Sequence, residues 1–352
     1  MKLLKSLKIF YQSILPNKQN YCFIFVMPQV SVIIPNYNHA LFLQQRIESV
    51  LKQTYQDFEI ILLDDASTDN SRDVISQYNN HPKIQICLND KNSGSPFKQW
   101  NKGLEKARGK YIWIAESDDY AEPNFLETLV PLLENNDRVG LAYCQSYVAD
   151  EKGNILKTNH WWTDDLSKTR WQHDFINSGI DECQNYIGVK NTIPNASAVL
   201  FRKDILNKVG DTEQSMTLCG DWMAWIEVLL KSDIAYSSQV LNYFRHHGDS
   251  VRNSCDRLRR SCEYATINLM LEKHIGLSSV LRQAREKIIY NSTEIICNPI
   301  SSISIAQKIK AYLLLKKLKN NVGETILKKT IINYRNFYLS RVKNKIEYFV
   351  SL

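Results

Sequence analysis

Short runs of consecutive apolar residues alternate along the chain with longer segments in which apolar residues recur every three or four positions. The short runs are typical of strands that are buried on both faces of a sheet. They lie at residues 30–34, 58–63, 84–88 and 111–115. The segments with helical spacing lie at residues 41–51, 71–78, 97–107 and 123–133. Strands that alternate with helices of this length predict an α/β fold, with a mostly parallel sheet flanked by helices.

The pattern is less regular between residues 141 and 243. Strands are expected there at residues 199–201 and 241–244, and a helix with Trp, Ile and Leu on one face is expected at residues 221–231. From residue 253 the chain contains few turn-forming residues, so it is predicted to be helical to its end.

Three segments follow from this pattern. Residues 1–27 are an N-terminal extension that we expect to be poorly ordered. Residues 28–252 are expected to form the α/β domain, and residues 253–352 a C-terminal helical region that is basic and amphipathic.

Polar residues directly follow three of the predicted strands. Pro35-Asn36-Tyr37-Asn38 follows the first strand, Asp64-Asp65 ends the second, and Asp118-Asp119 comes shortly after the fourth. In a parallel sheet, ligands bind beyond the carboxyl ends of the strands. We therefore expect a ligand site where these three clusters meet.

The acidic pairs indicate how an anionic ligand would be held. The sequence contains neither G-x-G-x-x-G after the first strand nor G-x-x-x-x-G-K-[ST] anywhere, so the glycine-rich phosphate loops are absent. Asp118 and Asp119 offer the oxygen ligands that Mg²⁺ and Mn²⁺ prefer, and such an ion would bridge them to a diphosphate. One acidic pair before a helix is usually a cap, but two pairs at successive strand ends favour ligand binding.

Five motifs, taken in chain order, resemble glycosyltransferase family 2. They are VSVIIPNYN at 30–38, LDDASTD at 63–69, ESDD at 116–119, GDW at 220–222 and RHHGDS at 245–250. The resemblance covers about residues 28–252. It implies the GT-A fold and an inverting transfer of a sugar from a nucleotide-diphosphate sugar, expected to be UDP-linked. By association with the basic amphipathic C-terminal region, which suits work on a lipid carrier, we expect the acceptor to be a hydroxyl of a glycan or a lipid-linked saccharide, in the synthesis of a surface polysaccharide.

The resemblance also implies which residues bind the nucleotide sugar. Pro35 and Tyr37 would line the base, Asp65 would contact its edge, and the stretch that begins at Asn92 would lie under the base and ribose. The complete predicted set is Pro35, Tyr37, Asn38, Asp65, Gly94, Lys98, Gln99, Asn101 and Asp118.

For the metal, which would be Mg²⁺ or Mn²⁺, the resemblance makes Asp119 the main ligand. Asp118 would face the ribose or the metal, and His247 would lie near the diphosphate or the metal. Asp221 would be the general base that removes the proton of the acceptor hydroxyl. Asp221 opens a predicted helix whose dipole favours a carboxylate, so a purely structural role at the helix start stays open.

Two positions depart from the family pattern. Glu116 stands where many members have Asp, and Gly220 stands where many have Glu. The first departure leaves the ligand positions intact, whereas the second concerns the orientation of the acceptor. Trp161-Trp162 is either a platform for the acceptor or structural, and Asn195-Ala196-Ser197 precedes a strand as acceptor loops do in the family.

Charge is concentrated at the C-terminus. The chain has a net charge of +7, and residues 301–352 contain eleven Lys and Arg against two Asp and Glu. This segment would either lie on an anionic membrane or pack on the domain with a solvated basic face. The expected membrane face consists of Tyr338, Leu339, Val342, Ile346 and Phe349, beside Arg341, Lys343 and Lys345. Nucleic-acid binding is not expected because no recognition module accompanies the charge.

The remaining composition excludes several classes. The eight cysteines are scattered without a C-x-x-C motif, which argues against a zinc site or a disulfide framework and for a cytosolic protein with reduced thiols. No apolar run approaches the ~18 residues of a membrane span. We therefore expect a cytoplasmic protein that lies peripherally on the inner face of the membrane.

Two other functions share some of these features. A sugar-phosphate nucleotidyltransferase also uses a parallel sheet and Mg²⁺, but it would open with a glycine-rich loop and a basic residue after the first strand. A non-catalytic binding protein on the same scaffold would have a degraded metal site, whereas Asp118, Asp119 and Asp221 are all present.

Overall fold

The structure is a computed structural model. It describes residues 27–158, 162–193, 195–210, 216, 218–248, 257–299, 303–333 and 335. The expected N-terminal extension before residue 27, the domain boundary near 253 and the expected membrane face beyond residue 335 lie outside the described residues.

Half of the central sheet is purely parallel, as the sequence predicts. The strands β3, β2, β1 and β4 lie side by side in this order and all run in the same direction. Their bounds are Val30–Asn36 for β1, Phe58–Asp64 for β2, Ile84–Leu88 for β3 and Tyr111–Ile114 for β4.

The other half of the sheet is mixed. β9 (Val199–Arg202) runs antiparallel to β4 on one side and to β6 (Val139–Ala149) on the other, so β6 points the same way as β4. β10 (Asp233–Arg245) pairs in parallel with β6. Three short antiparallel strands complete the described sheet, β5 (Tyr120–Ala121), β7 (Ile155–Thr158) and β8 (Phe175–Asn177).

Helices cover both faces of the sheet because successive strand residues point to opposite sides. On one face, Ile33, Ile61 and Leu63 pack in a hydrophobic core with side chains of α3, α5, α6 and α7. On the other face, Val32 and Ile34 pack with side chains of α1, α2 and α4. The helices are α1 (Ala40–Leu51), α2 (Ser71–Ser76), α3 (Pro96–Lys106), α4 (Phe125–Glu134), α5 (Gly179–Asn185), α6 (Lys203–Val209) and α7 (Gly220–Leu229).

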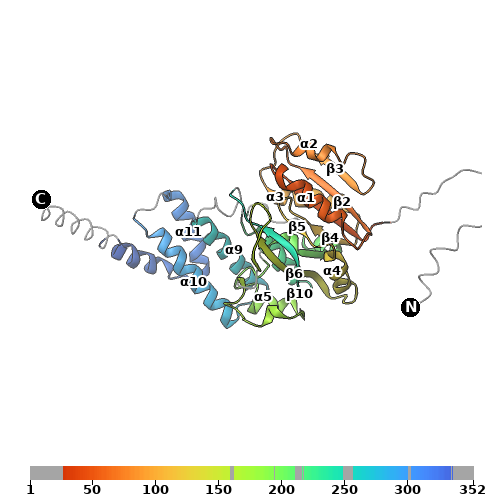
Figure 1. The fold of residues 1–352 in the computed structure, drawn as a ribbon. Coiled ribbons are helices and arrows are strands. Elements are labelled where there is room, and N and C mark those ends of the chain that lie inside the picture. Colours follow the sequence, from red (N-terminus) through yellow and green to blue (C-terminus); the bar gives the residue numbers. More distant parts are fainter. Residues whose placement is uncertain are drawn as a thin grey trace, which may run out of the picture.

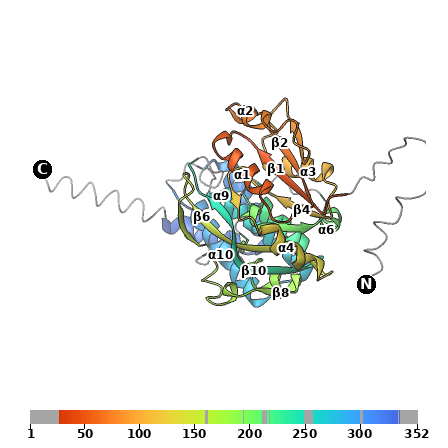
Figure 2. The same cartoon turned by 45° about the vertical axis from the view of Figure 1, so that its right-hand side comes forward.

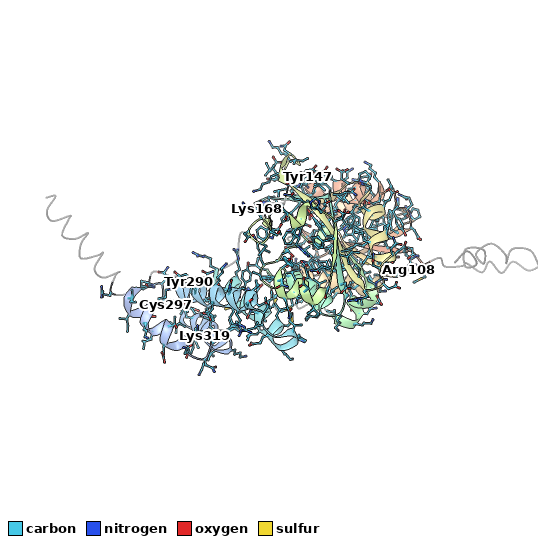
Figure 3. All side chains as sticks on the ribbon, turned by 90° about the horizontal axis from the view of Figure 1, so that it is seen from below. Arg108, Tyr147, Lys168, Tyr290, Cys297 and Lys319 are labelled. Atoms are coloured by element: carbon cyan, nitrogen blue, oxygen red, sulfur yellow. The ribbon has the colours of Figure 1, made fainter. Side chains whose placement is uncertain are left out.

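The C-terminal region is helical, as predicted, and packs against one end of the sheet domain (Figures 1 and 2). It contains α9 (Arg257–Ile275), α10 (Ser279–Ile296), α11 (Ile305–Leu318) and a further helix at 322–333. Its distal part has a hydrophobic core of its own, and in Figure 3 Tyr290, Cys297 and Lys319 mark this part, at the opposite end from Arg108.

The proximal part of the C-terminal region belongs to the core of the sheet domain. Ile267 and Leu271 of α9 and Leu281 of α10 lie in the same hydrophobic cluster as Trp222 and Trp225 of α7. In the described part of the chain, no helix is both long and apolar enough to cross a membrane.

Candidate active site

The chain topology brings five segments to one edge of the sheet. β1, β2, β4 and β10 point the same way, so the residues that follow them emerge at this edge. β9 runs in the opposite direction, so the residues that precede it arrive at the same edge. The clusters that the sequence places at strand ends therefore do meet, and the segment 195–197 joins them.

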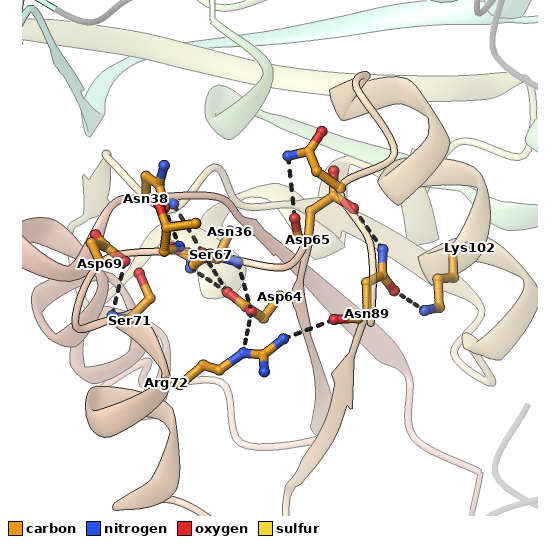
Figure 4. Close-up of polar contacts among 12 residues, drawn as sticks. Asn36, Asn38, Asp64, Asp65, Ser67, Asp69, Ser71, Arg72, Asn89 and Lys102 are labelled. Carbon is orange, nitrogen blue, oxygen red and sulfur yellow. Dashed lines mark hydrogen bonds and ion pairs between the residues drawn. The ribbon is translucent and has the colours of Figure 1, made fainter.

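Asp64 fixes the turn after β2 rather than facing a ligand. Its carboxylate accepts hydrogen bonds from Asn36 Nδ2 at 3.0 Å and Ser67 Oγ at 2.5 Å, and it pairs with Arg72 Nε at 3.2 Å (Figure 4). The side chain of Asn38 accepts from the backbone N–H of Thr68 at 2.7 Å, which ties the turn after β1 to the turn after β2. The predicted binding residue Asn38 thus shapes the loops.

The carboxylate of Asp65 organises the next loop. It accepts from Asn89 Nδ2 at 2.6 Å, from Ser93 Oγ at 2.7 Å and from Gln99 Nε2 at 2.9 Å. Gln99 lies on α3, so Asp65 connects the end of β2, the loop after β3 and the start of α3. Gln99 and Asp65 are both buried, which makes this arrangement rigid before any ligand arrives.

The other predicted nucleotide-binding residues surround this loop. Gly94 has a φ of +73°, a conformation that favours glycine, and Lys98 Nζ donates to the carbonyl of Ser93 at 3.0 Å. Asn101 is buried on α3, Pro35 is buried in β1, and Tyr37 is 44% exposed, so its ring is accessible. The described structure thus places all of these residues along one edge, from β1 to α3.

Asp119 is held tightly by protein donors. Its Oδ2 accepts from Asn195 Nδ2 at 2.9 Å and from Ser197 Oγ at 2.7 Å, and its Oδ1 accepts from the backbone N–H of Arg245 at 2.9 Å. Burial raises the pKa of Asp119 to about 6, and the neighbouring charge of Asp118 adds to this effect.

Asp118 lies beside two histidines. Its Oδ2 is 3.0 Å from His247 Nε2, and the ligand atoms of His39, Asp118 and His247 all lie within 4.8 Å of one another. Burial would raise the pKa of Asp118, but the hydrogen bond from His247 and the charges of both histidines outweigh it and lower the pKa. Neighbouring ligands of one divalent ion are about 3 Å apart when each lies ~2.1 Å from the ion. The Asp118–His247 contact of 3.0 Å has this spacing, and two imidazoles with one carboxylate are donor types that suit a divalent cation.

This geometry differs from the metal ligands that the resemblance implies, of which Asp119 would be the main one. Asp118 lies in the cluster with His247, whereas the carboxylate of Asp119 contacts Asn195, Ser197 and the backbone of Arg245. The role of Asp119 as the main ligand stays a prediction, and the structure gives Asp118 the position closer to the histidines.

A buried arginine balances the acidic turn. Arg46 of α1 is fully buried, donates from Nε to the carbonyl of Glu116 at 2.8 Å and lies over the ring of Trp113. Burial lowers the pKa of Arg46 to about 10 although Asp119 and Asp118 oppose this shift. Burial together with Asp118 also raises the pKa of Glu116 to about 8. Burial therefore disfavours the ionised forms of Glu116 and Asp119, and a bound cation would favour them.

A second arginine closes the site on the α1 side. The guanidinium of Arg245 lies between the rings of Phe42 and Tyr120, and its Nη2 donates to Gln45 at 2.6 Å. Phe42 also contacts the ring of His247, with 5.2 Å between the ring centroids. An open cavity of 780 Å³ lies next to these residues and is lined by Leu41, Phe42, Gln45, Asp150, Glu151, Lys152, Asn154 and Arg245.

Asp221 lies in the first turn of α7, where its Oδ1 accepts from the backbone N–H of Trp222 at 2.6 Å. The start of this helix is supported by the C-terminal region. Glu263 of α9 accepts from the backbone N–H groups of Leu218 at 3.0 Å and Cys219 at 2.8 Å. The position of the predicted base therefore depends on a residue beyond the five motifs.

The structure explains why glycine occupies position 220. A Cβ atom there would lie 2.5 Å from ring atoms of Phe97, which is closer than real side chains approach. Phe97 is buried on α3 and stacks edge-on against Trp100. The glutamate that many family members have at this position therefore has no room beside Phe97.

Sequence reasoning missed two contributors to the site, Arg46 and His39, and it assigned Asn195 and Ser197 only to an acceptor loop. Arg46 occupies a core position of the amphipathic helix α1, and a charged residue on an apolar face was a usable signal. His39 follows the first motif directly, but nothing in its local sequence indicated a contact with residue 118. Asn195 and Ser197 were noted for the acceptor loop, and their contact with Asp119 depends on the antiparallel insertion of β9.

Comparison with known proteins extends this picture. The model of the family described as Glycosyl transferase family 2 matches residues 31–210. Glycosyltransferase GlyG of Streptococcus pneumoniae serotype 4 is 39% identical over 108 residues, which are 31% of this chain and 36% of GlyG. Two further curated relatives are matched over 65% and 46% of their lengths, so the chain spans roughly a third to two thirds of these relatives.

Solved structures share the fold. S. aureus TarS 1-349 in complex with UDP-GlcNAc superposes with a TM-score of 0.64 and 16% identity, covering 90% of this chain and 92% of that chain. The mannosyltransferase PcManGT from Pyrobaculum calidifontis, in complex with GDP-Man and Mn²⁺, gives a TM-score of 0.56 and 14% identity, covering 88% of both chains. The α/β domain with its C-terminal helices therefore has the GT-A fold.

Proposed function

The chain belongs to glycosyl transferase family 2, and from this premise we propose that it transfers a sugar from a nucleotide-diphosphate sugar to a hydroxyl of a glycan or a lipid-linked saccharide. A donor linked to UDP is supported by the similarity to TarS, which was solved with UDP-GlcNAc, although PcManGT was solved with GDP-Man. A glycosyltransferase is thereby favoured over the nucleotidyltransferase and the binding protein.

The nucleotide would bind along the edge formed by β1, β2 and the start of α3. Tyr37 offers an exposed ring for stacking on the base, and Gly94 allows the ligand to approach the backbone closely. The rigid contacts of Asp65 with Ser93 and Gln99 keep this surface in shape, which lowers the entropy cost of binding. Pro35, Asn38, Lys98 and Asn101 complete the proposed surface.

The diphosphate would lie at the acidic turn. Asp118, His247 and His39 would hold the Mg²⁺ or Mn²⁺ ion, and Asp119 would keep the turn in position or share in ligation. A bound ion would neutralise the charge that the leaving diphosphate gains. The charge of Arg46 would offset part of the negative charge of the turn.

The acceptor hydroxyl is a weak nucleophile, so a carboxylate must remove its proton as the new bond forms. We assign this role to Asp221, because it lies in the family motif and at the positive end of the α7 dipole. Attack from the side opposite the leaving diphosphate would invert the configuration at the anomeric carbon.

A surface for the membrane is also proposed. α11 packs through Ala311, Leu315 and Leu318, yet its opposite side exposes Ile305, Ile309 and Leu313. Lys308, Lys310, Lys316 and Lys317 accompany this exposed stripe. An apolar stripe flanked by lysines is typical of helices that lie on anionic lipid. It supports a location on the cytoplasmic side of a membrane, where a lipid-linked acceptor and surface polysaccharide synthesis would be found.

The observation that carries the proposal is the 3.0 Å contact between Asp118 and His247, which brings two separate family motifs to one point at the ligand edge of the sheet. The test is a screen of UDP-, GDP- and dTDP-sugars with the purified full chain and Mn²⁺, measuring donor hydrolysis and transfer. We expect release of the nucleoside diphosphate from one donor class. Asp118→Asn should lose this activity, whereas His246→Gln, a change at an exposed neighbour, should keep it. Equal activity of the two variants would refute the assignment.

A further inference from the structure

The C-terminal region contains a buried carboxylate that the proposed chemistry does not use. Glu263 of α9 is only 7% exposed, and it lies on the same side of the helix as Ile267 and Leu271, which pack in the core of the sheet domain. Burying a carboxylate is unfavourable unless hydrogen-bond donors or opposite charges compensate it. The partners of Glu263 therefore indicate what it does.

These partners lie at the start of α7. The Oε2 atom of Glu263 accepts from the backbone N–H of Leu218 at 3.0 Å and from that of Cys219 at 2.8 Å. Cys219 is the N-cap residue of α7, and its side chain makes no capping hydrogen bond. Arg259, one turn earlier on α9, lies 3.6 Å from the other carboxylate oxygen, Oε1. A side chain from another helix thus fixes the backbone that leads into α7.

Asp221 comes two residues after this fixed segment. The backbone N–H of Met223 donates to the carbonyl of Cys219 at 2.9 Å, so the first turn of α7 begins at a residue that Glu263 holds. Asp221 lies within that turn and is half-buried. The direction of its carboxylate therefore depends on how the start of the helix is held.

The residue after Asp221 is fixed as well. Trp222 donates from Nε1 to the carbonyl of Ile187 at 2.7 Å, and its ring lies edge-on to that of Tyr264, with 5.1 Å between the ring centroids. Tyr264 directly follows Glu263 on α9, so one turn of α9 contacts the chain both before and after Asp221. A general base must lie within hydrogen-bond reach of the proton that it removes, so a shift of this backbone would impair it.

We propose that Glu263 is a positioning residue for sugar transfer, because its carboxylate holds the start of α7 where Asp221 can reach the acceptor hydroxyl. This inference rests on the proposed function, since it takes Asp221 as the general base. Glu263 acts through Asp221 and does not contact the reacting atoms. The C-terminal helices are then part of the catalytic unit, in addition to the membrane contact proposed for α11.

The first test compares two substitutions of Glu263 in the purified full chain. Glu263→Ala removes both bonds to the backbone and should lower kcat by roughly 10–100-fold, because a misplacement of about 1 Å can reduce a rate by 10². Donor affinity, measured by calorimetry, should stay near that of the wild type. Glu263→Gln keeps an oxygen that can accept both bonds and should restore most of the turnover. Arg259→Ala is the matched control, because it removes an exposed partner of the same carboxylate and leaves both backbone bonds in place.

Two further measurements separate positioning from a general loss of structure. In hydrogen exchange without ligand, the amides of Leu218 and Cys219 should exchange faster in Glu263→Ala, while those of β1 keep their wild-type rates. When Glu263→Ala is combined with Asp221→Asn, turnover should fall little below that of Asp221→Asn alone, because an absent base cannot be misplaced. If Glu263→Ala does not fold, Glu263→Asp replaces it, since the shorter side chain should weaken both bonds and give a smaller loss.

Unchanged kcat in a folded Glu263→Ala chain would overturn the inference and leave the proposed function intact. A loss that multiplies fully with the loss caused by Asp221→Asn would do the same, because Glu263 would then act independently of Asp221. A wild-type chain that transfers no sugar from any donor would instead reject the proposed function, and the inference with it.

Discussion

The backbone N–H of Arg245 donates a hydrogen bond to Asp119 Oδ1 over 2.9 Å, although 126 residues separate the two in the sequence. This bond joins the turn after β4 to the end of β10. The neighbouring residues Asp118 and His247 also meet, with 3.0 Å between Asp118 Oδ2 and His247 Nε2. The acidic turn is therefore shaped by the far end of the domain as much as by its own strand.

Asp118 and Asp119 should contribute unequally to metal binding. Asp118→Asn should weaken Mn²⁺ binding at least about tenfold more than Asp119→Asn, because Asp118 lies with the histidines while Asp119 is held by Asn195 and Ser197. Asp119→Asn should still remove most of the transfer activity while the fold is kept. Calorimetric titration with Mn²⁺ and initial rates give both readouts. The reverse order of Mn²⁺ affinities would make Asp119 the main ligand, as the family resemblance implies.

The stability of the metal-free protein should depend on pH through the acidic turn. The pKa of Glu116 is raised to about 8 and that of Asp119 to about 6, chiefly by burial and then by Asp118. Between about pH 4 and pH 8 the folded state therefore holds protons that the unfolded state has lost, so this contribution to stability falls as the pH rises. Saturating Mn²⁺ should remove this fall.

Asp118→Asn tests this dependence because Asp118 contributes to both raised pKa values. In chelator, the free energy of unfolding of the variant relative to the wild type should be higher at pH 8 than at pH 5.5, because the carboxylates of Glu116 and Asp119 then ionise without the neighbouring charge of Asp118. Urea unfolding at the two pH values measures the difference. The same relative stability at both pH values would contradict the assignment.

Asp221→Asn should reduce turnover by about 10²–10⁴ and leave donor affinity nearly unchanged, because general-base loss affects the chemical step. A carboxylate that serves only the helix start would behave differently. Asparagine is also a good residue at a helix start, so rate and stability would then stay close to the wild type. Donor binding by calorimetry and initial rate with a working acceptor distinguish the two cases.

Position 220 should be coupled to position 97. Gly220→Ala should lower the free energy of unfolding by about 1–3 kcal/mol, because the added Cβ would lie 2.5 Å from the ring of Phe97. In a chain that also carries Phe97→Leu, Gly220→Ala should lower the free energy of unfolding markedly less. A double-mutant cycle by denaturant unfolding measures the coupling, and strictly additive effects would show that the ring is not the obstacle. The same pair of backgrounds tests whether Gly220→Glu is accepted.

The exposed stripe of α11 should bind anionic vesicles. Ile309→Ser combined with Leu313→Ser should weaken this binding several-fold without loss of stability, since both side chains are more than half exposed. Co-sedimentation with vesicles at low and high salt gives the readout, because lysine contacts weaken as salt rises. Leu156→Ser on β7, which is 59% exposed, is the control. If the double variant and the Leu156→Ser control bind vesicles equally, the exposed stripe of α11 does not contact the membrane.

The first half of the fold could be predicted because its signals are local. β1 to β4 and the helices α1 to α4 lie within a few residues of the predicted bounds, since continuous apolar runs and helical spacing leave few alternatives. β6 was not predicted, although it is the central strand between β9 and β10. Gly140, Gln145 and Ser146 interrupt its apolar pattern, and the partners that stabilise it come from residues 199–245.

The candidate site, like the fold, was predictable only where the signals are local. Asp118 and His247 could be named because they belong to motifs, and their ligand atoms lie close together in the structure, while their role at a metal stays a prediction. His39 and the brace formed by Asn195 and Ser197 could not, because their roles depend on which strand lies next to which. His39 contacts Ser117, which lies 78 residues later in the chain. The local sequence around His39 carries no information about so distant a contact.

The antiparallel strand β9 also has a consequence for how the protein is made. On the ribosome, β1 to β4 can pair as soon as residue 114 has emerged, but β4 then has an open edge until Val199–Arg202 arrives to cover it. The acidic turn after β4 stays incomplete for longer, until Arg245 has been synthesised. A nascent chain that stalls in between exposes a sheet edge and lacks the bond that fixes the acidic turn, so this interval is when the chain most needs protection by chaperones.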